Sequence, residues 1–153
     1  MNPSIDPSTF RQAMRRLAGG VSVIIVGSGA DRTGFTATSV TSFSAEPPRL
    51  LICVNREGSS WSTLTDYRSF GVNLLDAEQQ DLADRFTGRN GEKGPARFFG
   101  AKWKTLVTGA PVLEGALAAF DCTVEEVIER QSHAIVIGRI EAVDLGRIGR
   151  AHV

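Results

Sequence analysis

Val21-Ser-Val-Ile-Ile-Val26 opens the most informative part of the sequence; Gly27-Ser-Gly-Ala-Asp-Arg-Thr-Gly34 and Phe35-Thr-Ala-Thr-Ser-Val-Thr-Ser-Phe43 follow it. The first run is short and β-branched, the second is rich in turn-forming residues, and the third is dense in Thr, Ser and Val. Together they predict a β-hairpin with a long loop. Pro47-Pro48 cannot lie inside a central strand, so we expect the second strand to end before it and a third to cover residues 50–55.

Three short helices are predicted beside these strands. The first begins at Asp6-Pro7, an N-cap followed by proline at the first helical position, and ends at Gly19-Gly20. Small hydroxyl residues open a second helix over residues 59–66. Asp76-Ala-Glu-Gln79 resembles a capping box that opens a third helix, which runs to about residue 86.

Further strands are expected over residues 70–75, 116–130 and 133–143, with a turn at residues 111–115 before the last two. Residues 87–100 carry four glycines and a proline, which predicts a loop, and loops of this length are often functional.

About six strands joined by short connections favour one fold class. It is a mainly β, antiparallel, Greek-key-like barrel with a few short helices, rather than a parallel α/β sheet. We expect a single domain over residues 1–153, with its core at about residues 10–143.

Composition excludes several kinds of partner. The chain has 153 residues, with 17 Lys and Arg against 17 Asp and Glu. This balance argues against nucleic-acid binding through many phosphates and against a polybasic membrane contact. Cys53 and Cys122 are isolated, so neither a metal site nor a disulfide is expected. With no basic and apolar leader and no apolar run near the about 18 residues of a membrane span, we expect a cytoplasmic protein.

Catalytic motifs of several enzyme classes are missing from the sequence. The glycines after the first strand lack the G-x-G-x-x-G spacing and precede a strand rather than a helix, so a plain hairpin turn is the better interpretation. The P-loop, the zinc-protease motif and the serine nucleophile elbow do not occur. His133 and His152 are the only histidines, which excludes a histidine-rich metal site.

Two segments offer the chemistry of a ligand site. Thr36-Ala-Thr-Ser39 places hydroxyls and backbone amides on a strand, although a Thr-rich strand without a function has the same composition. Cys53-Val-Asn-Arg-Glu-Gly-Ser-Ser60 is an apolar strand that ends in Asn, Arg, Gly and two Ser before a helix. Amides at a helix N-terminus, hydroxyls and an arginine suit a phosphate group. Lys93 and Arg97, in the flexible loop, are further candidates for a phosphate contact.

Several short motifs also occur in a defined order along residues 10–143. They are Phe10-Arg-x-Ala-x-x-Arg-Leu-Ala-x-Gly-Val-x-Val-Ile, Gly34-Phe-Thr-Ala-x-Ser-Val-x-Ser-Phe-Ser, Pro47-Pro48, Cys53-Val-Asn-Arg, Phe70-x-Val-Asn-x-Leu, Arg85-Phe86, Pro111-x-Leu-x-Gly-x-Leu-Ala, and His133 before Ile-x-Ile-Gly-Arg-Ile. Each motif is weak by itself, but the ordered set is specific. The chain resembles the short flavin reductases that serve two-component monooxygenases.

The resemblance implies a split-barrel flavin-binding fold, usually a homodimer, in which NADH or NADPH reduces FMN or FAD. Reduced flavin would then be released to a separate flavin-dependent monooxygenase. It also implies site residues. Along the isoalloxazine ring and the ribityl chain would lie Thr36, Ala37, Thr38 and Ser39. The ribityl and phosphate end would be held by Cys53, Val54, Asn55, Arg56, Ser59 and Ser60. The flavin would be covered by Phe86, Thr87 and Lys93, and the nicotinamide would lie beside His133.

These implied roles suit the residue types. A flavin needs an apolar slot, backbone donors and a few strong phosphate contacts, and hydride transfer between two cofactors needs no protein nucleophile. A positively charged His133 would stabilise negative charge on the reduced flavin, whereas a neutral ring would stack and hydrogen-bond; the sequence leaves both open. Gln131-Ser132 stands where relatives often have Gly-Asp, so a carboxylate that orients the histidine is missing. Gly58 and Ser60 stand where relatives frequently have Ser and Thr, respectively.

Two alternatives stay open at this point. One is a flavin-binding module that stores or senses flavin without nicotinamide turnover. The other is a split-barrel oxidase that resembles the pyridoxamine-phosphate oxidase group, which the Thr-Ala-x-Ser motif and the late histidine fit less well. The sequence does not choose between FMN and FAD, or between NADH and NADPH.

Overall fold

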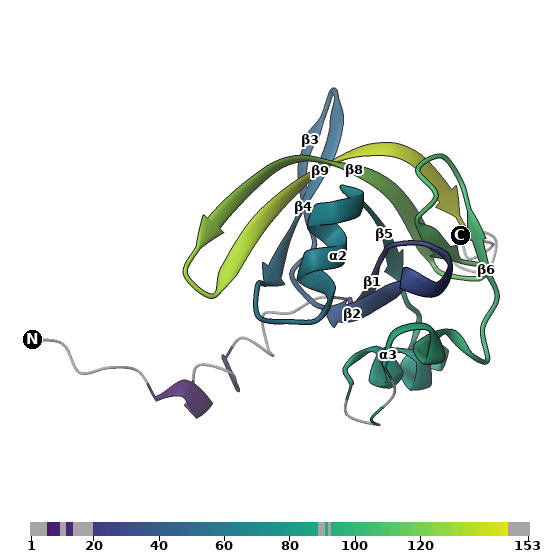
Figure 1. Ribbon diagram of the computed structural model, residues 1–153, viewed down its shortest axis with the longest axis horizontal. Helices are drawn as coiled ribbons and strands as arrows, with labels where there is room; N and C mark the ends of the chain where they lie inside the picture. Colours follow the sequence, from purple (N-terminus) through teal and green to yellow (C-terminus); the bar gives the residue numbers. More distant parts are fainter. Residues whose placement is uncertain (1–5, 10–11, 14–19, 89–90, 92, 147–153) are drawn as a thin grey trace, which may run out of the picture.

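A seven-stranded antiparallel sheet makes up most of the molecule in the computed structural model, which describes residues 6–9, 12–13, 20–88, 91 and 93–146 (Figure 1). In chain order its strands are β1 (Ser22–Val26), β2 (Thr33–Ala37), β3 (Thr41–Ala45), β4 (Pro48–Asn55), β5 (Ser69–Leu74), β8 (Ala118–Arg130) and β9 (His133–Leu145). Across the sheet they follow the order β2-β1-β5-β8-β9-β4-β3. A separate two-stranded sheet contains β6 (Trp103–Thr105) and β7 (Pro111–Leu113).

The sheet curls into a barrel because consecutive strands lie at its two opposite edges. β2 and β3 are the edge strands, yet only residues 38–40 separate them in the chain. Laid flat, seven strands would hold these edges about 29 Å apart. The connection from Ala37 to Thr41 spans at most about 14 Å. The two edges must therefore approach each other, and the register shifts in β8 next to Asp121 and Val124 help the long strand to bend.

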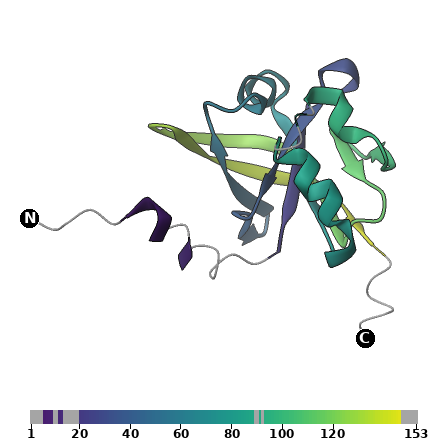
Figure 2. The same cartoon turned by 90° about the horizontal axis from the view of Figure 1, so that it is seen from below.

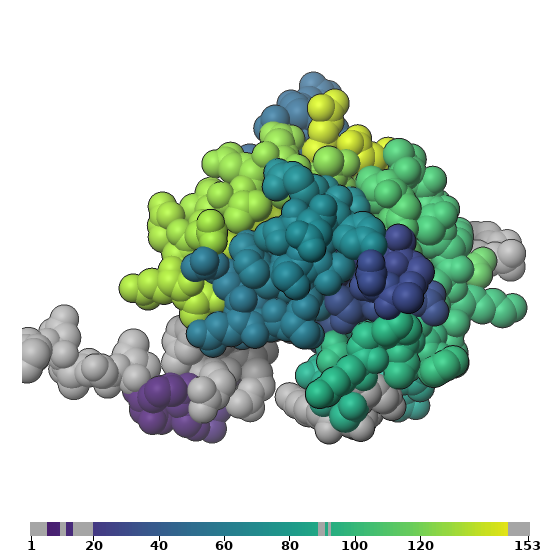
Figure 3. All heavy atoms as spheres, viewed as in Figure 1, coloured from purple at the N-terminus to yellow at the C-terminus, as the bar shows by residue number. Residues whose placement is uncertain are grey.

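Helical segments are short and pack outside the sheet. They are η1 (Gly29–Asp31), α2 (Ser60–Tyr67), η2 (Ala77–Gln79), α3 (Gln80–Phe86) and η3 (Gly94–Phe98). The space-filling view shows α2 in the middle of one face, with the end of the β8–β9 hairpin on one side of it (Figure 3). From below, α3 and η3 lie together on one side of the barrel (Figure 2). The predicted capping box is confirmed, because Asp76 accepts from the Glu78 amide and its own amide donates to Gln79.

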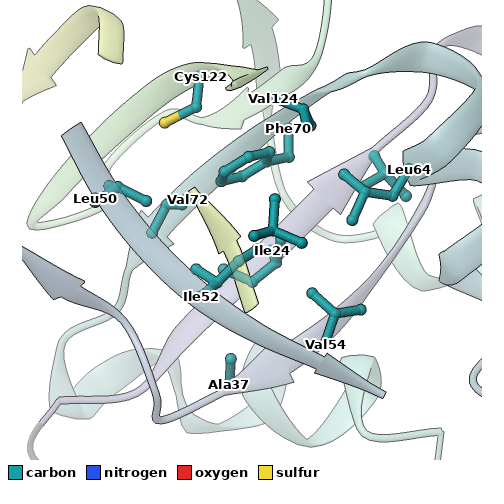
Figure 4. Packing of buried hydrophobic residues seen from close by; sticks show 12 residues of the cluster. Ile24, Ala37, Leu50, Ile52, Val54, Leu64, Phe70, Val72, Cys122 and Val124 are labelled. Atoms are coloured by element: carbon teal, nitrogen blue, oxygen red, sulfur yellow. The ribbon is translucent and has the colours of Figure 1, made fainter. Parts of the chain in front are cut away.

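The core has two parts, and β1 contributes to both. All five residues of β1 are buried because each face of the strand is covered. Ile24 packs inside the barrel, where Phe70 and Ile52 are also buried (Figure 4). Ile25, on the opposite face, packs with Phe86 in the second cluster, which fills the space under α3 and η3. This second cluster fixes α3 beside β2, and that placement shapes the site described below.

The predicted strand over residues 35–43 is wrong in one respect. It is two strands, β2 and β3, which pair with β1 and β4 at opposite edges of the sheet. A run of Thr, Ser and Val is typical of both strands and says nothing about the crossing between them. The third predicted strand is confirmed as β4, although it already begins at Pro48. The first residue of a strand is a position that proline tolerates.

The predicted turn at residues 111–115 is confirmed only for residues 114–115, because β7 covers Pro111–Leu113 and pairs with β6. Buried side chains hold this part of the chain. The side-chain nitrogen of Asn73 donates to the Val23 carbonyl at 3.1 Å, and its side-chain oxygen accepts from the backbone amide of Leu113 at 2.7 Å. Such a link between β1 and β7 connects segments far apart in sequence, so local patterns do not reveal it.

The start of the first predicted helix is confirmed, since the Asp6 carboxylate accepts from the amide of Thr9 at 3.1 Å. Much of the rest of that prediction, including Phe10, Met14 and Leu17, lies outside the described residues. Among the described helices, none is long and apolar enough to cross a membrane.

Candidate functional site

A cleft of about 270 Å³ lies where the end of β4 and the start of α2 face β2, the end of α3 and η3. Its described lining consists of Gly34, Phe35, Thr36, Val54, Asn55, Gly58, Ser59, Ser60, Phe86, Thr87 and Arg97. Two larger hollows, of about 600 and 410 Å³, contain none of the predicted site residues. The smaller cleft is therefore the candidate site.

The structure brings part of the predicted set together in this cleft. The predicted residues that line it are Thr36, Val54, Asn55, Ser59, Ser60, Phe86 and Thr87. The predicted residues that do not line it are Ala37, Thr38, Ser39, Cys53, Arg56, Lys93 and His133. The first group comes from a strand, a strand end, a helix start and a helix end that are well separated in the chain.

Strand alternation explains part of this division, although Val54 and Asn55 line the cleft from opposite faces of β4. Successive side chains of a strand point to opposite faces, so Val54 faces the core while Cys53 is exposed on the outside of β4. On β2, Ala37 is buried in the barrel core, and the Thr36 hydroxyl on the other face donates to the Ala83 carbonyl of α3 at 2.6 Å. Thr38 is exposed in the crossing segment.

The start of α2 forms the polar end of the cleft. Ser59 is the N-cap residue, yet its side chain makes no capping hydrogen bond, and Ser60 is buried at the first helical position. Both hydroxyls line the cleft beside the first backbone amides of the helix. The serines and the helix amides of this predicted segment therefore share one end of the cleft, without its arginine, and their contact with a phosphate stays a prediction.

Within the described lining of the cleft the cation is Arg97, whereas the resemblance implied Lys93. Arg97 lies in η3 and donates from Nη1 to the Gly34 carbonyl at 2.7 Å, which ties η3 to β2. Lys93 is exposed and is absent from the described lining. The sequence signal for Arg97 was the same as for Lys93, a cation in a glycine-rich loop. The two side chains point in different directions because Lys93 precedes the 3₁₀ helix η3, which begins at Gly94, and Arg97 lies within it.

Residues 14–151 match the profile of the family described as "Flavin reductase like domain". The chain belongs to this family. It is 41% identical over 140 residues to the FMN reductase (NADH) RutF of Yersinia enterocolitica, which covers 92% of this chain and 76% of that protein. BorF, the flavin reductase component of a bacterial two-component tryptophan halogenase, superposes with a TM-score of 0.83 at 34% identity, covering 92% of this chain and 88% of BorF. The NADH:FAD oxidoreductase SgcE6 of Streptomyces globisporus superposes with a TM-score of 0.80 at 30% identity, covering 95% of this chain and 88% of SgcE6.

The predicted split-barrel fold is therefore confirmed for this flavin reductase-like domain. The donor set of the cleft also fits a flavin. Phe35, Val54 and Phe86 supply an apolar wall, and Ser59, Ser60 and Arg97 supply groups of the kind that can donate to a phosphate. Within the described lining, no cysteine, lysine or histidine is present as a nucleophile.

Arg56 of this flavin reductase-like domain reaches away from the cleft. Its Nη2 pairs with the Glu129 carboxylate at 2.7 Å, and its Nη1 donates to the Gln131 carbonyl at 2.7 Å. The guanidinium carbon lies 5.9 Å from the Trp61 ring centre. Among the described residues its buried Nε has no hydrogen-bond partner. The predicted phosphate contact of Arg56 stays a prediction.

His133 is the exposed first residue of β9 and lies directly opposite Asn55 of β4 in the antiparallel ladder. Residues opposite each other in such a ladder have their side chains on the same face, about 5 Å apart at Cβ. Because Asn55 lines the cleft, the histidine is next to the cleft rather than in it. The His133 Nδ1 lies 2.8 Å from the Ser132 hydroxyl.

Cys122 has no role in this site. It is fully buried in β8 among the barrel core. Burial raises the pKa of its thiol far above the usual range, and the charges of Asp121 and Glu141 raise it further. The thiol is therefore held protonated and unreactive.

Proposed function

We propose that this protein reduces FMN or FAD with a hydride from NADH or NADPH and supplies the reduced flavin to a separate flavin-dependent monooxygenase. The observation that carries the proposal is the cleft itself. It joins an apolar wall to a helix N-terminus with two serine hydroxyls and an arginine, in a chain of the flavin reductase-like family. Relatives named as FMN reductase (NADH) and as NADH:FAD oxidoreductase support NADH as the donor.

The residues of the cleft would bind and orient rather than react. Ser59, Ser60 and Arg97 would hold the phosphate of the flavin, and Phe35 and Phe86 would exclude water from beside its rings. When bound, the flavin supplies the redox chemistry by accepting a hydride at its ring system. His133 would contact the nicotinamide at the edge of the cleft. No covalent step on the protein is required.

The proposal includes a homodimer. A single chain offers a cleft of about 270 Å³. Ligand pockets usually measure about 300–1,000 Å³, so one chain alone encloses little of a flavin. On the outer face of the sheet, Ile135 pairs directly with Cys53 of β4 and Ile128 of β8, and all three are partly or fully exposed. A second copy packed on this face would cover these side chains and complete the wall next to Asn55 and His133.

Anaerobic reduction tests the proposed activity. The purified protein is mixed with NADH or NADPH and an excess of FMN or FAD, and the loss of oxidised-flavin absorbance is followed in the visible range. We expect bleaching well above the rate of the same mixture without protein, and the four pairings identify the preferred flavin and nicotinamide. Flavin that binds but is not bleached beyond that background would instead identify a storage or sensing module.

A further inference from the structure

The turn at the end of the β8–β9 hairpin is contacted by the residue that follows β4. Residues 129–133 are all exposed, and the hairpin projects beyond α2 (Figure 1). Arg56, which follows β4, makes three contacts with it. Its backbone amide donates to the Ser132 carbonyl at 2.8 Å, and its guanidinium contacts the Gln131 carbonyl and the Glu129 carboxylate, each at 2.7 Å.

The geometry of the turn makes these contacts important. Arg130 and His133 form the last pair of the ladder, so Gln131 and Ser132 alone make the turn. Gln131 has a φ of 53°, which is a left-handed backbone conformation that residues other than glycine and asparagine rarely adopt. Within the described residues, Arg56 is the contact from outside the hairpin that holds this turn. The turn leads directly into His133, which pairs with Arg130 and with Asn55 at the start of β9.

Ser132 acts on the imidazole directly. Its hydroxyl lies 2.8 Å from His133 Nδ1, and a hydroxyl either donates to a bare ring nitrogen or accepts from a protonated one. A carboxylate at this distance would only accept, and would fix the proton on Nδ1. A serine therefore allows the neutral tautomer in which Nδ1 accepts and Nε2 carries the proton toward a ligand.

We propose that Arg56 and Ser132 are positioning residues for His133. Arg56 fixes the turn to the strand that ends at the cleft, and Ser132 orients the imidazole through Nδ1 while allowing the tautomer with its proton on Nε2. The inference rests on the proposed nicotinamide contact of His133. It assigns Arg56 to the hairpin rather than to the flavin phosphate.

A spectroscopic experiment on the protein without ligands tests the role of Ser132. The chain has two histidines, so nitrogen-15 histidine labelling gives two imidazole signals, and His133→Ala assigns them. We expect the Nδ1 signal of His133 to shift in Ser132→Ala, because the hydrogen bond to Nδ1 is lost, and to stay at its parent position in Ser132→Thr. An unchanged His133 signal in Ser132→Ala would overturn the role of Ser132. Ser42→Ala, an exposed serine of β3, is the matched control.

Steady-state kinetics test both residues and separate the inference from the proposed function. Ser132→Ala should raise the KM for the nicotinamide about fivefold, which corresponds to one neutral hydrogen bond, with the flavin KM unchanged and Ser132→Thr restoring it. Arg56→Lys should act in the same direction and add nothing in a His133→Ala background. An effect of Arg56→Lys that persists there and raises the flavin KM would overturn its positioning role.

The kinetics of His133→Ala alone are the reference for the Ser132→Ala and Arg56→Lys variants. If His133→Ala changes the nicotinamide KM but Ser132→Ala and Arg56→Lys do not, the positioning inference fails while the proposed function stands. If His133→Ala itself has no effect on an active enzyme, the nicotinamide contact of His133 is wrong, and the inference fails with it. Unchanged far-ultraviolet circular dichroism confirms that each variant is folded.

Discussion

At Gly138 the backbone of β9 passes directly against the ring of Phe70. A Cβ atom at this position would lie 2.5 Å from Cζ of that ring, in the middle of the barrel core. We expect Gly138→Ala to lower the free energy of unfolding by about 1–3 kcal/mol, because overpacking forces neighbouring atoms to move. Urea unfolding followed by circular dichroism measures the loss.

A double-mutant cycle checks that the contact with Phe70 is the cause. Phe70→Leu removes the ring atoms that the new methyl group would meet. Gly138→Ala should therefore cost less in the Phe70→Leu background than in the parent protein. Equal costs in both backgrounds would contradict this explanation.

The Cys122 thiol links stability to pH. Because burial raises its pKa in the folded state, the thiol ionises more readily in the unfolded chain. The stability that depends on this group is full below the unfolded pKa of about 8.5 and falls as the pH rises above it. Cys122→Ala should therefore make stability less dependent on pH above about 8.5.

The buried thiol should also be protected from reagents. In a Cys53→Ser background, we expect Cys122 to react with a thiol reagent only after unfolding. Rapid labelling of the folded protein would contradict this prediction.

Among the elements, η3 contributes the cation of the cleft. We expect Arg97→Gln to weaken FMN binding about 10- to 100-fold, the range for loss of a hydrogen bond to a charged group. Lys93→Gln is the matched control, since it removes a cation from the same loop outside the described lining, and it should change the Kd less than about threefold.

Fluorescence quenching of FMN on binding gives both dissociation constants. Arg97 also holds Gly34, so Arg97→Lys, which keeps the charge, and a thermal melt separate lost binding from lost structure. A larger effect of Lys93→Gln than of Arg97→Gln would reverse the assignment and support the original sequence prediction.

Elements were predictable where their signals are local. The capping box at Asp76, the hydroxyl-rich start of α2 and the continuous apolar run at the start of β9 depend on neighbouring residues, and all three are found. β6 and β7 were missed because each has only three residues. They depend on distant partners, such as the buried Asn73 amide, that no local pattern contains.

For the whole molecule, the outer face of β4, β8 and β9 determines the expected assembly. We expect the protein to have about twice the mass of one 16.4 kDa chain in sedimentation. Ile135→Glu should produce a monomer and weaken flavin binding, because a buried charge without a partner is costly. Val107→Glu, at a side chain 67% exposed in a loop between β6 and β7, is the matched control and should leave the mass unchanged. A parent protein that is monomeric and fully active would contradict the prediction.

The candidate site was predictable in its chemistry and less so in its geometry. Thr36 could be identified from a motif that occurs in the family order, and Ser59 and Ser60 as hydroxyls between a strand end and a helix; all three line the cleft. The directions of Arg56, Lys93 and Arg97 could not be identified, because a cation in a loop reaches several places. Their positions depend on the β8–β9 turn and on η3, which are packed against distant parts of the chain.

The connection between β2 and β3 has a consequence for how such a site changes. Residues 38–40 alone join the two edges of the barrel, so the circumference of the barrel depends on the length of this connection. Thr36, one residue before the end of β2, lines the cleft. Inserting a single residue at positions 38–40 would therefore widen the space for a ligand with the buried core side chains retained, whereas a deletion there would also displace Val40, which packs against the barrel core. The size of the accepted flavin would then vary through chain length rather than through substitution.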